Sequence, residues 1–162
     1  MDLAAVRIGD GEIVSSTDTD FMERSISLSP NGRWLAYESD RTGDTEVYIR
    51  SFPDLSERFE PGSSAGGMSP VWSPRGDELF YLNGARQMVS VPVDAAEDLV
   101  IGREQVLFDI PDGVLTDPGD YYAQYERDRA ARRFMMLLAP GASDAPRLAI
   151  LLNAFSLLDG RG

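Results

Sequence analysis

An internal repeat constrains the fold of this chain more than any other feature of its sequence. The segment Ser29–Tyr37 (SPNGRWLAY) recurs as Ser73–Tyr81 (SPRGDELFY), a displacement of 44 residues between positions 29 and 73. Each copy begins with Ser-Pro-x-Gly, in which Pro presets φ for a turn and Gly supplies a positive φ. Consecutive apolar residues follow, as a strand buried on both faces requires. A period of about 40–45 residues with four strands per repeat is typical of a β-propeller blade.

Strands are predicted on both sides of each turn. They are residues 25–28, 34–38, 46–50 and 58–60 in the first repeat, and residues 70–72, 79–82, 87–91 and 105–108 in the second. Hairpins through residues 40–44 and 83–86 join the second strand of each repeat to the third. Residues 4–8 and 12–15 are predicted to be the last two strands of an earlier blade, joined across Gly9-Asp10-Gly11.

A third, eroded copy is predicted from Tyr121 onward. Its strands are residues 122–125, 133–138 and 147–152, its turn at residues 128–131 lacks Pro and Gly, and residues 155–158 form a helical turn. The predicted fold is therefore all-β, a partial propeller of about three to three and a half four-stranded blades. The predicted divisions of this one propeller domain are residues 1–20 (end of a preceding blade), 21–62 and 63–110 (two blades), and 111–162 (degenerate blade with a C-terminal tail).

The two turn-strand segments resemble the TolB-like (WD40-like) propeller repeat, in which Ser-Pro-Asp-Gly precedes an apolar strand. A wider set of segments occurs in the same order in one subgroup: Phe21–Ser25, Glu46–Pro53, Gly66-Gly67, Pro70–Trp72, Glu78–Tyr81 and Leu151–Asn153. That order is similar to the C-terminal propeller of bacterial serine/threonine protein kinases. The resemblance covers residues 3–158 and implies a sensor or docking propeller.

Several positions depart from the pattern that this resemblance implies. Asn31 and Arg75 stand where the repeat usually has Asp, and Ala154 stands where the subgroup commonly has Trp. The kinase itself is not part of the chain, because a sequence without His has no His-Arg-Asp catalytic loop and no glycine-rich nucleotide loop is present. The resemblance therefore implies the propeller without the enzyme that it usually accompanies.

Composition excludes most common catalytic sites. The chain has 0 His and 0 Cys, which removes Ser-His-Asp and Cys-His catalysis, the usual zinc sites and disulfides. We therefore expect no enzyme activity, assign no catalytic, cofactor-binding or metal-binding residues, and expect no cofactor. The net charge of −12 opposes binding to nucleic acids and to anionic membrane surfaces, so neither is an expected partner.

The sequence also predicts a location. No stretch approaches the roughly 20 apolar residues that cross a bilayer, and Met1–Arg7 lacks the basic and apolar regions of a signal peptide. We expect a cytoplasmic protein as the chain stands, and an extracytoplasmic one for a fragment of a membrane-anchored kinase or an exported protein.

The segment Gly62-Ser63-Ser64-Ala65-Gly66 matches the G-x-S-x-G pattern of a hydrolase nucleophile elbow. That elbow needs a preceding strand, a following helix and a histidine base, whereas the flanks here are a loop and Pro70 and the sequence has no histidine. A turn between blades is the favoured interpretation. Related propellers cap prolyl-oligopeptidase-type hydrolases, so an accessory propeller of such an enzyme, with its catalytic domain absent, is the alternative function.

Other polar clusters have simple structural interpretations. Asp40, Asp44 and Glu46 surround Gly43 with oxygen ligands suited to calcium, but a polar hairpin turn explains them better. Asp18 and Asp20 are predicted to lie in a solvated connector. The mixture of arginine and tyrosine favours an ion-paired hairpin over stacking with single-stranded nucleic acid; its members are Arg127, Arg129, Arg132, Arg133, Tyr121, Tyr122 and Tyr125.

Aromatic and apolar residues of the two repeats are predicted to form the blade interior. Trp34 and Trp72 are expected to pack between blades and not to stack on a ligand. Leu35 and Leu79 are expected to be fully buried, and Tyr37 and Tyr81, which share the 44-residue offset, to be equivalent interior residues.

The leading functional prediction is a non-catalytic module for protein–protein interaction or ligand sensing, with loops at one end of the blades as the binding surface. A purely structural blade fragment that assembles is a third class. A propeller closes with about four to eight blades, so we expect a homodimer that closes the ring, in which residues 4–15 complete a blade across the interface. A monomer whose third blade curls over the open core is the competing outcome.

Overall fold

Every regular element described in the structure is a β-strand. The computed structural model describes residues 2–55, 58–59, 66–95, 98–114, 116, 125–127, 133–136 and 149–152, and the strands within them confirm the all-β prediction. Within these residues there is no helix whose length and hydropathy suit a bilayer crossing. The tail at 155–158 and the eroded turn at 128–131 lie outside the described residues.

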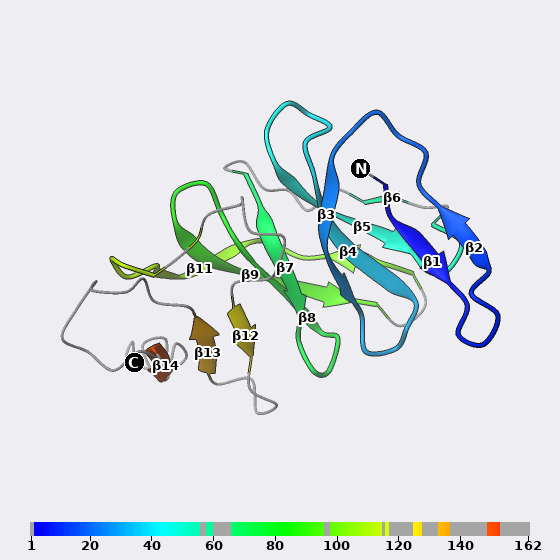
Figure 1. Ribbon diagram of the computed structural model, residues 1–162. Coiled ribbons are helices and arrows are strands. Elements are labelled where there is room, and N and C mark those ends of the chain that lie inside the picture. The colour runs from blue at the N-terminus through cyan, green and yellow to red at the C-terminus, as the bar shows by residue number, and fades with distance from the viewer. Residues whose placement is uncertain are drawn as a thin grey trace.

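The strands form antiparallel sheets that follow one another in chain order (Figure 1). An N-terminal hairpin contains β1 (Ala4–Val6) and β2 (Ile13–Ser16). Blade 1 contains β3 (Glu23–Leu28), β4 (Trp34–Ser39), β5 (Glu46–Ser51) and β6 (Arg58–Phe59). Blade 2 contains β7 (Met68–Trp72), β8 (Glu78–Leu82), β9 (Gln87–Asp94), β10 (Val100–Ile101) and β11 (Gln105–Asp109). The C-terminal sheet contains β12 (Tyr125–Arg127), β13 (Arg133–Met136) and β14 (Ala149–Leu152).

The two Ser-Pro-x-Gly turns have the same geometry. Gly32 and Gly76 adopt φ of 70° and 75°, and their amides donate to the carbonyls of Ser29 and Ser73, each at 2.9 Å. The repeat also extends to a feature that the sequence did not reveal. Ser25 and Ser69, again 44 residues apart, both adopt positive φ of 52° and 53°, and both lie at a register shift in the inner strand of a blade.

Some predicted strands differ from the observed ones. Blade 2 has five strands where four were expected, because Val100 and Ile101 pair with an extension of β9 beyond the predicted end at Val91. Strand β1 ends at Val6, since Arg7 already belongs to the turn and accepts a hydrogen bond from the Gly11 amide at 3.1 Å. Strand β12 begins at Tyr125, where the predicted strand ended.

Each blade buries both faces of its second strand. We call the face turned toward the preceding sheet in sequence the rear face, and the opposite face the front face. On β4, Trp34 and Ala36 point forward into one core cluster with Leu79 and Tyr81 of β8. Leu35 and Tyr37 point to the rear, toward Leu3 of the N-terminal hairpin.

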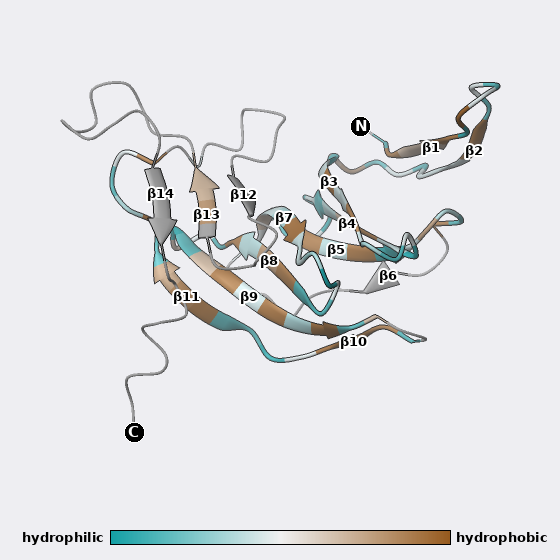
Figure 2. Cartoon of the chain, turned by 90° about the horizontal axis from the view of Figure 1, so that it is seen from below, coloured by the Kyte–Doolittle hydropathy of each residue, from teal (hydrophilic) through white to brown (hydrophobic). Residues whose placement is uncertain are grey.

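On β8 the pattern repeats one sheet later. Leu79 and Tyr81 face the rear, and Phe80 and Leu82 face forward into a cluster with Phe134 and Met136 of β13. Leu35, Tyr37, Leu79 and Tyr81 are 6%, 1%, 0% and 0% exposed, which confirms the predicted burial and the equivalence of the two tyrosines. Figure 2 shows hydrophobic residues as brown bands along the central strands, such as β5, β8 and β9.

Polar contacts connect blade 1 to blade 2 as well. The Trp72 indole Nε1 donates to the Ser27 carbonyl at 3.1 Å, and the buried carboxylate of Glu38 accepts from the Ser69 amide at 2.5 Å and from Arg24 Nε at 2.8 Å. Because Trp34 and Trp72 are both buried in the cluster between the blades, their predicted packing role is confirmed.

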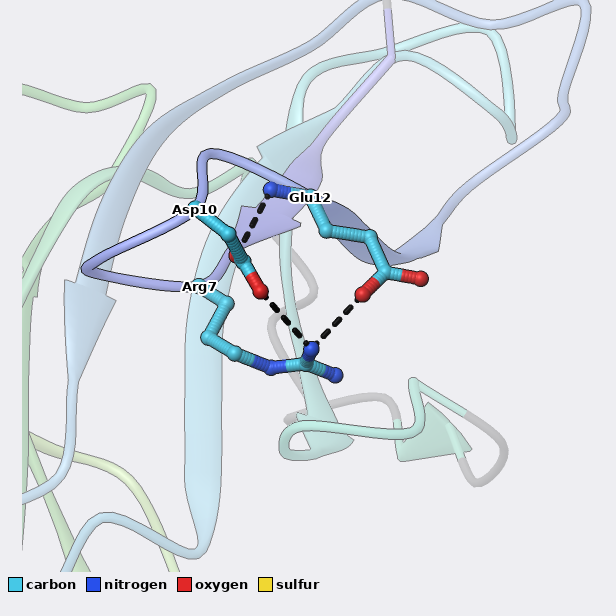
Figure 3. A network of polar contacts seen from close by, with 3 residues as sticks. All are labelled: Arg7, Asp10 and Glu12. Atoms are coloured by element: carbon cyan, nitrogen blue, oxygen red, sulfur yellow. Dashed lines mark hydrogen bonds and ion pairs between the residues drawn. The ribbon is translucent and has the colours of Figure 1, made fainter.

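The N-terminal hairpin is stabilised at its turn by an exposed ion cluster (Figure 3). Arg7 Nη1 donates to Asp10 Oδ2 at 3.1 Å and to Glu12 Oε2 at 2.6 Å, and the Glu12 amide donates to Asp10 Oδ1 at 3.0 Å. Thr17 ties the hairpin to blade 1, because its hydroxyl accepts from the Leu3 amide at 2.8 Å and donates to the buried Glu23 carboxylate.

Candidate binding cleft

A cleft of about 570 Å³ opens between blade 1 and blade 2, at the end of the strands where β4 turns into β5 and β8 turns into β9. The Ser-Pro-x-Gly turns lie at the opposite end of the same strands, because neighbouring strands are antiparallel. Three segments form the walls, and the lining residues are Asp44, Thr45, Glu46, Gly66, Met68, Gly84 and Ala85. We call this set the loop cleft.

The β4–β5 loop forms the first wall and is held by Asp40. The Asp40 carboxylate accepts from the Met22 amide at 2.8 Å, and its carbonyl accepts from the Gly43 amide at 2.9 Å. The Arg41 guanidinium lies 5.2 Å from the centre of the Phe21 ring, in the range of a cation–π contact. These contacts fix the loop that presents Asp44 to the cleft.

Glycines let the segment before β7 pass between the two loops. The Gly67 amide donates to the Thr45 carbonyl at 2.8 Å. A Cβ at Gly67 would lie 3.0 Å from Val47 Cγ2 and 3.2 Å from the Val47 amide nitrogen, and a Cβ at Gly66 would lie 3.4 Å from the Thr45 carbonyl oxygen and 3.7 Å from the Gly84 nitrogen. Gly66 also has a φ of 75°, which side chains disfavour. A side chain at Gly67 would therefore require Val47 to shift by a few tenths of an ångström, and one at Gly66 would have to adopt a disfavoured φ.

Asn83 builds the third wall, the β8–β9 loop. Its side-chain oxygen accepts from the Ala85 amide at 3.1 Å and from the Gln87 amide at 2.9 Å. Arg86 leaves the loop with a φ of 59°, and its guanidinium donates to Thr116 Oγ1 at 2.6 Å and to the Val114 carbonyl at 3.2 Å. These hydrogen bonds attach the Arg86 side chain to the segment that follows β11.

Beneath the glycines lies the buried ring of Tyr81. A Cβ at Gly67 would lie 3.4 Å from Tyr81 Cδ2, and the Tyr81 hydroxyl donates to Glu104 Oε1 at 2.5 Å. Burial raises the pKa of Tyr81 above its ordinary value, and the neighbouring carboxylates of Glu104 and Glu46 raise it further. The phenol therefore stays neutral, as a buried group next to the segment that carries Gly66 and Gly67.

The chemistry of the loop cleft is acidic. Asp44 and Glu46 are the charged residues among those that line it, and the remaining lining residues supply a hydroxyl, backbone groups of glycine and the Met68 side chain. Within the described part of the chain, no three carboxylates come together as a metal site would require. Asp40, which the sequence grouped with Asp44 and Glu46, instead caps the segment before β3. The arrangement suits a cationic group such as an ammonium or a guanidinium.

The other motifs of the sequence fall elsewhere. Of the G-x-S-x-G segment, residues 62–65 lie outside the described residues, and Gly66 lines the loop cleft. Arg127 and Arg133 lie in β12 and β13, and Arg129 and Arg132 lie outside the described residues. A second hollow of about 210 Å³ at the opposite end is lined by Asn31, Arg75, Gly76, Asp77, Val93, Asp94 and Ala95.

The sequence did not predict this site. The carboxylates around Gly43 were interpreted as a polar hairpin turn, the glycine pair at 66 and 67 entered only through the family resemblance, and nothing local indicated that Gly84 and Met68 would meet them. Those contacts arise from the packing of one blade on the next, over sequence separations that no local pattern encodes.

Solved structures share this architecture. An oligogalacturonate lyase from Vibrio parahaemolyticus matches with a TM-score of 0.57 and 15% identity, covering 85% of this chain and 36% of its own. An oligogalacturonate lyase in complex with manganese matches with a TM-score of 0.57 and 16% identity, covering 84% and 35%. TolB from Acinetobacter baumannii matches with a TM-score of 0.56 and 17% identity, covering 93% and 35%.

The chain has the fold of these β-propellers. It spans about a third of the length of each of them, which agrees with the partial set of blades seen here. No protein-family model matches the sequence, and no curated protein matches it at the sequence level.

Proposed function

We propose that this chain is a non-catalytic propeller module that binds a cationic segment of a partner protein in the loop cleft. The observation that carries the proposal is that Asp44 and Glu46 both line an open cleft between two blades, in which hydrogen bonds hold the β4–β5 and β8–β9 loops. Loops held on a rigid β scaffold are the usual place for binding sites in such folds.

Electrostatics favours a basic ligand over other classes. The chain carries a net charge of −12, which attracts cations over several ångströms and raises their rate of encounter. The two carboxylates of the cleft add a local negative potential that attracts lysine or arginine side chains.

The absence of catalysis is part of the proposal and has its own test. The sequence has no His, Cys or Lys, so the available reactive groups are carboxylates, Tyr, Ser and Thr. We expect no turnover of chromogenic esters, peptides or glycosides. Turnover that survives purification and is abolished by replacing one carboxylate contradicts the proposal, since paired carboxylates alone suffice for glycoside hydrolysis.

Binding is tested with a fluorescein-labelled tetralysine peptide, followed by fluorescence anisotropy at low salt. We expect saturable binding that weakens as salt is added, because exposed ion pairs are screened over a Debye length of about 10 Å at 0.1 M salt. The double variant Asp44→Asn/Glu46→Gln is expected to weaken binding by about tenfold, equivalent to about 1.4 kcal/mol.

The matched control is Asp98→Asn/Asp112→Asn, which removes the same charge at positions outside the lining of the loop cleft. It is expected to weaken tetralysine binding by about twofold or less, and a labelled tetraglutamate peptide is expected not to bind. Equal losses in the two double variants would show that the peptide responds to net charge alone, and that result rejects the cleft as the site.

For the parent architecture we propose a sensor propeller related to the C-terminal propellers of bacterial serine/threonine protein kinases. The order of segments from Phe21 to Asn153 supports this relation. The alternative is an accessory propeller of a prolyl-oligopeptidase-like hydrolase. The DNA next to the coding region separates them: kinase-coding sequence supports the first, and a histidine-containing hydrolase supports the second and rejects the first.

A further inference from the structure

Strand β7 approaches the loop cleft through a bulge at Ser69. The pairing register with β8 shifts between Met68 and Val71, so β7 carries one extra residue there. Ser69 adopts a φ of 53°, a left-handed conformation that side chains disfavour. A bulge re-aims the side chains beside it, and Met68, directly before Ser69, lines the loop cleft. The geometry of the bulge therefore sets how β7 contributes to the cleft.

The carboxylate of Glu38, on β4 of blade 1, holds this bulge across the joint between the blades. Its Oε1 accepts from the Ser69 amide at 2.5 Å. Its Oε2 accepts from Arg24 Nε at 2.8 Å, and the Glu38 side chain is 3% exposed. A buried amide needs an acceptor, and hydrogen bonds to a carboxylate are stronger than those between neutral groups. Glu38 therefore stabilises the left-handed conformation of Ser69.

Contacts with blade 1 bracket Met68 on both sides. The Gly67 amide donates to the Thr45 carbonyl at 2.8 Å, and the Ser69 amide donates to Glu38. Thr45 lines the loop cleft, whereas Glu38 is not among the lining residues. Apart from its charge, Glu38 can therefore affect the cleft only through β7.

We propose that Glu38 is a positioning residue of the loop cleft, which holds the Ser69 bulge so that Met68 and the two glycines before it keep their places between the loops. The inference rests on the proposed binding of a cationic segment in this cleft. Without an acceptor at position 38, Ser69 relaxes toward an ordinary negative φ, and the residues before it on β7 shift with it. The carboxylates of Asp44 and Glu46 then line a cleft of altered shape, and the affinity for a cationic ligand falls.

The experiment compares two double variants of equal net charge by fluorescence anisotropy with labelled tetralysine at low salt. Arg24→Met/Glu38→Gln keeps an oxygen that accepts from the Ser69 amide, and Arg24→Met/Glu38→Ala removes it. Each variant loses one positive and one negative charge, so both keep the net charge of −12. We expect the glutamine variant to bind like the natural chain and the alanine variant to bind about fivefold more weakly, the scale of coupling through residues that do not touch the ligand.

Restoring the bulge without Glu38 gives a second readout. Glycine adopts positive φ readily, so adding Ser69→Gly to the alanine variant is expected to recover most of the lost affinity. Ser69→Pro, which has no amide hydrogen and cannot adopt this φ, is expected to weaken binding with Glu38 in place. It replaces the alanine variant in the comparison if circular dichroism shows that variant to be unfolded.

The outcomes separate this inference from the proposed function. Equal affinities of the glutamine and alanine variants overturn the inference, as does an alanine variant whose affinity Ser69→Gly fails to raise, or a Ser69→Pro variant that binds like the natural chain. In each of these cases, weaker binding by Asp44→Asn/Glu46→Gln still supports the cleft as the site. A natural chain that does not bind tetralysine rejects both the inference and the proposed function.

Discussion

Leu35 and Leu79 illustrate how the repeat acts at the level of single residues. Each lies on the rear face of its blade's second strand and packs against the preceding sheet. Their neighbours differ: Leu35 meets a two-stranded hairpin through Leu3, and Leu79 lies in a cluster with residues of β4 and β5 of blade 1. The same position thus has a small partner in one blade and a large one in the next.

We expect Leu79→Ala to lower the free energy of unfolding by about 2–5 kcal/mol, because it leaves a cavity in a fully buried site. Leu35→Ala is expected to cost less within that range, since the smaller hairpin has more room to relax. Urea denaturation followed by circular dichroism measures both. Val106→Ala, at an exposed position, is expected to change stability by about 0.5 kcal/mol or less; an equal loss there rejects the burial argument.

Tyr81 makes stability depend on pH at the alkaline end. Because burial and the adjacent carboxylates raise its pKa in the folded chain, the unfolded chain loses this proton first, near the ordinary tyrosine pKa of about 10. The stability that this group contributes is fully present below about pH 10 and is lost as the pH rises further, by about 1.4 kcal/mol per pH unit.

Urea titrations between about pH 9 and pH 11 measure this dependence. We expect Tyr81→Phe to have a lower stability at neutral pH, because Glu104 loses its donor, and a shallower decline above about pH 10. The slope of the free energy of unfolding against pH tests the assignment, because the lost hydrogen bond lowers stability without changing that slope. Parallel slopes for the two proteins contradict the assignment.

At the scale of elements, the Ser-Pro-x-Gly turns fix where each second strand begins. Their glycines have φ of 70° and 75°, a region that costs other residues about 1–2 kcal/mol. They differ in surroundings: a Cβ at Gly32 meets nothing within 4 Å, and a Cβ at Gly76 lies 3.4 Å from Pro30 Cδ in the turn of the other blade.

We therefore expect Gly32→Ala to lower the free energy of unfolding by about 1–2 kcal/mol and Gly76→Ala to lower it by at least as much. Gly32→Asn is expected to recover part of the loss, because asparagine tolerates positive φ better than alanine. Thermal and urea unfolding measure these differences. An alanine variant as stable as the natural chain at position 32 is incompatible with the described turn.

The elements also show what a single sequence can and cannot predict. Strands β4 and β8 were predictable because a turn with a defined geometry precedes consecutive apolar residues. Strand β10 was missed because two residues, Val100 and Ile101, carry no periodicity and pair only after β9 extends to meet them. The burial of Glu38 was unforeseen as well, since its partners Arg24 and Ser69 come from another strand and another blade.

For the whole molecule, the excess of acidic residues is the dominant electrostatic property. A net charge of −12 on a chain of 162 residues repels itself in the folded state. The ion pairs at Arg7 and Arg75 are exposed and offset this repulsion only slightly.

We expect the melting temperature to rise by several degrees when NaCl is increased from about 20 mM to about 300 mM, because salt screens repulsion between exposed charges. Differential scanning fluorimetry across this range measures the effect. A melting temperature that falls with salt would show that attractive ion pairs outweigh the repulsion. A charge-reducing variant such as Asp98→Asn/Asp112→Asn is expected to show a smaller rise.

The position of the two tryptophans gives this chain a built-in optical probe. Trp34 and Trp72 are the only indoles in the sequence, and both lie in the cluster between blade 1 and blade 2. Intrinsic tryptophan emission therefore reports on a single joint, whereas far-ultraviolet circular dichroism reports on all the sheets together. Coincident transitions in the two signals mean that the blades unfold as one cooperative unit, and separated transitions mean that this joint opens at a different stage from the rest.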